Sequence, residues 1–315
     1  MRKLSSALGN TASGNTALGN TALGLLLAIS VSLAVAGSKP AAAADPDGLA
    51  EAGVLKVGII PAEDARAVVK QSQEVMNQVS KSLNMKTDIF VGSDYNATIE
   101  ALRANKVDVA LMGAFGYVLA TTQAPVEAFA VTVTKASNSP DYHSIIIARK
   151  DEADLTSLES VKGHTFAFVD PSSTSGSLMP KAALMDAHIV PETDLKKVIY
   201  SGGHDASIIA VAEGKVDAAA VADRIYAIAC QKGAVDCSKI KVIWTSPPIP
   251  NDPLFYRKAI SEGMKKRIAD AFYEIRDLTF GEMGTVARFA PTTDANYDVI
   301  RNIAKTLNLD LTKMK

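Results

Sequence analysis

A run of hydroxyl side chains is the first feature of this sequence that could bind a ligand. The segment 172–177 holds five Ser or Thr residues in six positions, after a predicted strand at 164–170 and before a predicted helix. The N-terminus of a helix leaves backbone N–H groups free and carries the positive end of the helix dipole. Hydroxyl donors gathered there favour an anion site, and we single out Ser173, Thr174 and Ser175. A simple N-cap is the alternative, because Ser and Thr commonly cap helices.

A second candidate is the segment Ser201-Gly202-Gly203-His204, again between a predicted strand and a predicted helix. The imidazole of His204 can donate a hydrogen bond to an oxyanion. The two glycines before it allow the backbone to come close to a ligand. The alternative is an ordinary surface or core histidine.

An internal repeat places these candidates in equivalent positions. Residues 97–120 align without gaps on residues 206–229 at an offset of 109, and nine of the 24 positions are identical. Each copy predicts a helix, a Lys-Val-Asp turn, a buried strand and a second helix; chance similarity of two Ala-rich stretches is the alternative. Ligands of open α/β sheets bind beyond the carboxyl ends of the strands. This rule makes Tyr95, His204 and Asp223 candidates for a cleft.

A carboxylate in such a site would select among ligands. It can accept a hydrogen bond only from a ligand that still carries a proton or an amine, so Asp223 would favour protonated or amino-bearing oxyanions. A helix N-cap is the alternative role for this residue. The candidate set needs no Arg or Lys, because hydroxyls, amides and a histidine can bind an anion by hydrogen bonds alone.

Catalysis is not expected from these residues. Ser175, His204 and Asp223 could be arranged as a nucleophile, a base and an acid, but the Gly-x-Ser-x-Gly turn of such hydrolases is missing. The four histidines show no metal-binding spacing. We therefore predict a protein that is not an enzyme and that has no metal and no cofactor.

The elements that must position these residues alternate along the chain. Short β-rich runs and helical patterns alternate from Val54 onward, which indicates an α/β fold with parallel sheets and crossover helices. The tail from Ser261 onward reads as two amphipathic helices, at 261–278 and 294–308. The predicted strands are 55–60, 86–91, 107–113, 127–133, 144–149, 164–170, 196–201, 216–222 and 241–246.

Composition limits the class of protein. A length of 315 residues suits two domains, and 33 Lys+Arg against 34 Asp+Glu give a net charge of −1. No basic surface is therefore expected, which argues against nucleic acid as a partner.

The N-terminus has the features of an export signal. Two basic residues, the apolar run 23–36 and the small residues Ala42-Ala43-Ala44 predict a signal peptide that is cleaved after Ala44. The apolar run is shorter than a membrane span requires. Because the periplasm is oxidising, we expect Cys230 and Cys237 to form a local disulfide.

Four motifs together resemble the phosphonate and phosphite ABC-transporter substrate-binding family. They are SDYNATIEALRANKVDVALMG at 93–113, PSSTSGSLMP at 171–180, GGHDASIIAVAEGKVDAAAV at 202–221 and SPPIPNDP at 246–253. The similarity covers about residues 54–290. Two segments, 113–117 and Asp223-Arg224, depart from the sequence usual in that family.

The resemblance implies a hinged fold that traps its ligand between two lobes. We expect a class II-like periplasmic binding protein in which each lobe is a mixed, mostly parallel sheet flanked by helices. After the signal peptide at 1–44, residues 45–143 plus 252–315 would form lobe one, and residues 144–251 would form lobe two.

The resemblance also implies eight ligand-binding positions. The hydroxyl run, one tyrosine and the histidine would bind the phosphorus oxygens, a second tyrosine would form an aromatic wall, and two acidic residues would meet a substituent or a ligand proton. In the same order, these residues are Ser173, Thr174, Ser175, Tyr95, His204, Tyr142, Asp223 and Asp252.

The expected function is that of a periplasmic solute-binding subunit of an ABC importer. Its ligand would be a small phosphorus oxyanion, with phosphite, methylphosphonate and aminoethylphosphonate left as alternatives. Its partner would be the permease in the inner membrane, and the protein would be a monomer. The alternative is an oxyanion sensor, for example for arsenite or phosphite, that signals to a membrane histidine kinase.

Overall fold

The computed structural model describes residues 46–314. The predicted signal peptide at 1–44 lies outside the described residues and stays a prediction. Within the described part, no helix combines the length and apolar character that are needed to cross a membrane.

The larger sheet has seven strands, and its parallel part lies at one side. β1 pairs in parallel with β2 and β3, whereas β12, β4 and β14 pair antiparallel. In order across the sheet, the strands are β13 (Leu278–Thr279), β14 (Thr285–Pro291), β4 (Val126–Thr134), β12 (Pro253–Arg257), β3 (Val109–Leu111), β1 (Val54–Ile59) and β2 (Lys86–Val91).

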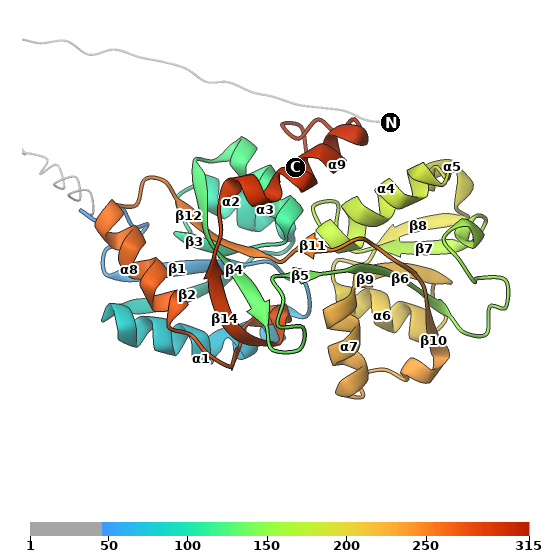
Figure 1. The fold of residues 1–315 in the computed structure, drawn as a ribbon, viewed down its shortest axis with the longest axis horizontal. Coiled ribbons are helices and arrows are strands. Elements are labelled where there is room, and N and C mark those ends of the chain that lie inside the picture. Colours follow the sequence, from blue (N-terminus) through green and yellow to red (C-terminus); the bar gives the residue numbers. More distant parts are fainter. Residues whose placement is uncertain (1–45, 315) are drawn as a thin grey trace, which may run out of the picture. The chain divides into compact units, whose positions relative to one another are not determined.

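The smaller sheet has five strands and is also mixed. β7 is parallel to β8 and β9, and β6 is antiparallel to β9 and β10. In order, the strands are β10 (Ile240–Thr245), β6 (Ser144–Arg149), β9 (Ala218–Ala222), β7 (Thr165–Phe168) and β8 (Lys197–Tyr200). We call the part built on the larger sheet the first lobe and the part built on the smaller sheet the second lobe (Figure 1).

Helices flank both sheets, and in α1 the capping residues explain where the helix begins and ends. In α1, the Asp64 side chain accepts hydrogen bonds from the backbone N–H groups of Arg66 and Ala67, and Asn84 ends the helix in a left-handed conformation with φ 53°. The first lobe contains α1 (Ala65–Leu83), α2 (Tyr95–Arg103), α3 (Ala114–Gln123), α8 (Glu262–Tyr273) and α9 (Asp298–Thr306). The second contains the π-helical turn η2 (Thr174–Leu178), α4 (Met179–Asp186), α5 (Pro191–Asp194), α6 (His204–Ala212) and α7 (Asp223–Gln231).

The chain passes between the lobes through two short strands that pair with each other. β5 (Asp141–Tyr142) and β11 (Ile249–Pro250) are antiparallel, with Tyr142 opposite Ile249 (Figure 1). Two adjacent extended connections are suited to hinge motion, because a few residues can absorb the change in dihedral angles. The predicted lobe boundaries at 143/144 and 251/252 each lie just after one of these two strands. They remain a prediction.

The predicted helix–strand–helix repeat is confirmed. α2, β3 and α3 correspond to α6, β9 and α7, and the helices of the two copies begin at the same offset of 109. The aspartate of each Lys-Val-Asp turn also has the same role. Asp108 accepts a hydrogen bond from Lys56 N in β1, and Asp217 accepts one from Thr165 N in β7, again 109 positions apart. Each aspartate thereby ties the turn to the neighbouring parallel strand.

Two expectations about the fold need correction. The larger sheet has two parallel and four antiparallel strand pairs, and the smaller sheet has two of each, so both sheets are mixed and neither is mostly parallel. The tail is not two helices alone, because β13 and β14 lie between α8 and α9. In the first lobe, both differences have one cause. The chain returns to the first lobe through β12 and β14, which pair with β3 and β4 without a crossover helix.

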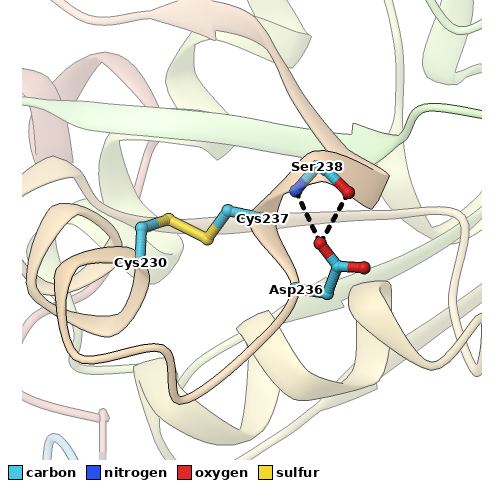
Figure 2. The surroundings of a disulfide bond; sticks show 4 residues. All are labelled: Cys230, Asp236, Cys237 and Ser238. Carbon is cyan, nitrogen blue, oxygen red and sulfur yellow. Dashed lines mark hydrogen bonds between the residues drawn. A yellow bond between two sulfur atoms is a disulfide. The ribbon is translucent and has the colours of Figure 1, made fainter.

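The expected disulfide is present and connects the end of α7 to the turn that leads into β10. Cys230 in α7 is bonded to Cys237 in the 3-10 turn η3 (Cys237–Lys239), as Figure 2 shows. Next to it, the Asp236 side chain accepts hydrogen bonds from the backbone and hydroxyl of Ser238. The bridge closes a short loop on the second lobe.

We predict that the Cys230→Ser/Cys237→Ser double variant is less stable but still binds ligand. Loss of a crosslink with a sequence separation of 7 should lower the free energy of unfolding by about 2 kcal/mol. Urea unfolding would measure this. Ser238→Ala, which keeps the disulfide, is the control and should change the free energy of unfolding by about 0.5 kcal/mol or less. An unchanged urea midpoint for the double variant would contradict a stabilising role.

Candidate functional site

The hydroxyl run is buried at the point where the second lobe meets the first. All five of its hydroxyl residues are at most 5% exposed. Ser173 caps η2, since its Oγ accepts a hydrogen bond from Gly176 N at 3.1 Å, and the carbonyl of Ser175 accepts one from Ser144 Oγ at 2.6 Å. Ser173 is therefore the N-cap of η2, as the alternative predicted. The other buried hydroxyls of the run do not cap this helical turn.

Thr174 connects the two lobes. Its Oγ1 accepts a hydrogen bond from Phe115 N, in the first turn of α3, at 2.9 Å. A Cβ atom at Gly113 would lie 3.0 Å from the same oxygen, so glycine permits this close approach. Because the Thr174 hydroxyl accepts from Phe115, its own hydrogen is available for a ligand.

His204 is the first residue of α6 and is 4% exposed. Its Nδ1 accepts a hydrogen bond from Ala222 N at 3.1 Å, which places the ring proton on Nε2. Burial, aided by the positive charge of Arg224, lowers the pKa of His204 to about 3. The imidazole is therefore a neutral hydrogen-bond donor at neutral pH.

Two tyrosines complete the donor set. The Tyr95 side chain is 1% exposed, and its hydroxyl has no hydrogen-bond partner of good geometry within residues 46–314. Burial raises the pKa of Tyr95 well above its usual value, with the nearby Glu282 adding to the effect. Burial and Asp252 also raise the pKa of Tyr142 to about 12. Both phenols therefore keep their protons.

Arg224 lies beside two of the candidate residues, Tyr142 and Asp252, although the candidate set was expected to need no Arg or Lys. Its guanidinium stacks on the Tyr142 ring at 4.1 Å from the centroid, and its Nη2 donates to Asp252 Oδ2 at 3.2 Å. Its Nε and Nη1 are buried and have no partner among the described residues. Burial acts to lower the pKa of Arg224, but Asp252 and Tyr142 outweigh it and raise the pKa. The guanidinium remains charged.

Two buried acids accompany this cation. Asp252 and Glu282 are each 1% exposed, and Glu282 belongs to the short turn η4 (Gly281–Met283). Burial and then the neighbouring Asp252 raise the pKa of Glu282 well above its usual range. We therefore assign a proton to Glu282.

Comparison with known proteins identifies the family of the chain. Residues 57–297 match the family described as "ABC transporter, phosphonate, periplasmic substrate-binding protein". The chain belongs to this family.

Two relatives and one solved structure illustrate the similarity. The phosphonates-binding periplasmic protein of Escherichia coli is 34% identical over 226 residues, which are 69% of this chain and 65% of that protein, slightly under two thirds of its length. The phosphate-import protein PhnD of Mycolicibacterium smegmatis is 28% identical over 270 residues, which are 79% of this chain and 84% of that protein. A binding protein component of an ABC phosphonate transporter from Pseudomonas aeruginosa has a TM-score of 0.74 at 27% identity, and the match covers 81% of this chain and 86% of that one.

Asp223 borders a surface cleft, whereas most of the other candidate residues are buried. Its Oδ1 accepts a hydrogen bond from the next residue's backbone N at 2.7 Å, and it faces a cleft of about 460 Å³ that also borders Tyr142 and Arg224. Arg224, the next residue, reaches the buried acids. A ligand contact by Asp223 stays a prediction.

Sequence reasoning missed Arg224 and Glu282. Arg224 had one signal, because Asp223-Arg224 departs from the sequence usual in the family. Glu282 had none, since it lies in a turn within the segment that was expected to contain only helices.

The low pKa of His204 predicts how stability depends on pH. An unfolded histidine binds a proton below about pH 6.5, whereas folded His204 binds one only near pH 3. The free energy of unfolding should therefore fall as pH drops from about 6.5 towards 3, by up to about 1.4 kcal/mol per pH unit. Urea unfolding of wild type and His204→Gln at several pH values would show this slope as a difference between them. A proton resonance of His204 that titrates near pH 6.5 would contradict the prediction.

Proposed function

We propose that this protein captures a small phosphorus oxyanion between its two lobes and delivers it to the permease of an ABC importer. It would work in the periplasm as a monomer after removal of residues 1–44. The lobes would be residues 45–143 plus 252–315 and residues 144–251. Membership of the substrate-binding family supports the transport role.

One observation carries the proposal: three buried residues with hydrogen-bond donors, Tyr95 in the first lobe and Thr174 and His204 in the second, each contact the opposite lobe. The Tyr95 hydroxyl, the Thr174 hydroxyl hydrogen and the neutral His204 Nε2–H all lie at helix N-termini. Helix N-termini favour anions because their N–H groups are free and their dipoles are positive there. Buried donors need acceptors, and an oxyanion supplies several in a small volume.

Lobe closure would complete the site. Besides the Phe115–Thr174 bond, His204 N donates to Ala62 O at 2.8 Å, and Asp64 N donates to an Asp205 carboxylate oxygen at 3.0 Å. Each bond joins the first lobe to the second. A ligand that binds groups of both lobes shifts the equilibrium towards the closed form, which the permease could recognise.

Binding without catalysis fits the surroundings of His204. One ring nitrogen accepts from a backbone N–H, so no carboxylate orients this imidazole as a base.

Calorimetric titration of the mature chain tests the proposal. The ligands are phosphite, methylphosphonate, aminoethylphosphonate, phosphate, sulfate and arsenite. We expect micromolar or tighter binding of at least one phosphite or phosphonate and no binding of sulfate. Binding of arsenite alone would instead favour a sensor, and binding of none would reduce the hydroxyl run to a helix cap.

Thr174→Ala should weaken binding of the best phosphorus ligand by about 1 to 3 kcal/mol, because it removes one buried donor and the bond to Phe115. Thr174→Ser keeps the hydroxyl and should retain most of the affinity. Thr122→Ala, on the exposed face of α3, is the control. Equal affinity of Thr174→Ala and wild type would exclude Thr174 from the site.

A further inference from the structure

Three charged side chains from both lobes form a second half of the candidate site. We call Arg224, Asp252 and Glu282 the charged subsite. Arg224 is the second residue of α7 in the second lobe, whereas Asp252 precedes β12 and Glu282 lies in η4, both in the first lobe. The only interaction of good hydrogen-bond geometry among them in the described chain is the Arg224 Nη2 bond to Asp252 Oδ2.

The charged subsite has free donors and free acceptors side by side. Arg224 Nε and Nη1 have no acceptor, and Asp252 Oδ1 and both Glu282 oxygens have no partner of good geometry within residues 46–314. Buried polar groups are rarely left unpaired, because each loses its hydrogen bonds to water. A ligand that satisfies this subsite must both donate and accept.

Arg224 is held on two sides in the closed arrangement of the lobes. The Tyr142 ring supports one face of the guanidinium, and Asp252 holds Nη2. A preorganised guanidinium loses little freedom when it binds an anionic group, and it is suited to carboxylates.

A bare alkyl group would suit this subsite poorly. It would cover the free groups of Arg224 and Asp252 and offer neither an acceptor nor a donor. An ammonium group alone would satisfy the acids and leave Arg224 unpaired, and a carboxylate alone would do the reverse. A substituent that carries both groups satisfies both sides and matches the charge of each.

We propose that the charged subsite binds the substituent of the ligand, and that this substituent carries both a carboxylate and an ammonium group, as in a phosphonate amino acid. The carboxylate accepts from one free edge of the guanidinium, at Arg224 Nε or at Nη1. The ammonium group donates to Asp252 Oδ1 and to the carbonyl oxygen of the protonated Glu282. This inference rests on the proposed function, in which the phosphonate end lies at Tyr95, Thr174 and His204.

Charge balance agrees with this assignment. Arg224 already forms an ion pair with Asp252 at 3.2 Å, so a substituent that carries one negative and one positive group adds no net charge to the charged subsite.

Calorimetric titration with four phosphonates tests the inference on the wild-type protein. The ligands are methylphosphonate, phosphonoacetate, aminoethylphosphonate and 2-amino-3-phosphonopropionate. We expect 2-amino-3-phosphonopropionate to bind at least about tenfold more tightly than methylphosphonate, with the two singly charged substituents between them. If methylphosphonate binds as tightly as the amino acid, the inference is wrong while the proposed function stands. If none of the four binds but phosphite does, the inference is wrong and the proposed function still stands; if phosphite does not bind either, the proposed function fails as well.

The Arg224→Gln variant tests which end of the ligand Arg224 contacts. It should weaken binding of phosphonoacetate and 2-amino-3-phosphonopropionate by about tenfold or more, and of methylphosphonate by less than about threefold. An equal loss for all four ligands would place Arg224 on the phosphonate oxygens and overturn the assignment.

Two further variants guard against a folding defect. Arg103→Gln, which removes an exposed ion pair with Glu100, is the matched control and should bind all four ligands as wild type does. Arg224→Lys keeps the charge in case Arg224→Gln does not fold. The wild-type ranking of the four ligands needs no variant at all.

Discussion

The cost of burying polar groups away from water dominates this site. A buried donor without an acceptor loses the hydrogen bonds it made to water, and a buried charge without a partner costs more. Tyr95 and Arg224 retain free buried donors, and Asp252 and Glu282 retain free buried oxygens. The closed arrangement is therefore satisfied only when a ligand supplies the missing partners. Binding and lobe closure become one event, because the groups that need the ligand come from both lobes.

The fold produces this arrangement by repetition. Each lobe contains the same helix–strand–helix unit, and the two copies place Tyr95 and His204 at equivalent helix N-termini. In the proposed site, two helix dipoles of the same sign would face the ligand, which favours an anion. The charged subsite breaks this symmetry. Arg224 has Phe115 as its counterpart in the first lobe, where the backbone N–H contacts Thr174. One lobe therefore contributes a backbone donor at this position and the other a guanidinium.

Much of this arrangement could be predicted from local sequence patterns. The repeat, the hydroxyl run, His204 and the disulfide all depend on residues close together in the chain, and their elements formed as expected. The strands β12 and β14 could not be predicted in this way, because they pair with β3 and β4 over more than a hundred positions. Glu282 reaches the site only through that long-range pairing. Arg224 was visible as a departure from the family, but its burial against Tyr142 and Asp252 depends on lobe contacts that no local pattern encodes.

A crystal structure of the mature protein with its tightest phosphorus ligand tests the central claim most directly. We predict the phosphorus atom between the lobes, with its oxygens within hydrogen-bonding distance of the Tyr95 hydroxyl, Thr174 Oγ1 and His204 Nε2. The contacts that join the lobes, such as Phe115 to Thr174, should be present. A ligand bound instead in the surface cleft of about 550 Å³ lined by Arg149, Lys150 and Lys239, with the groups between the lobes still unpaired, would contradict the account.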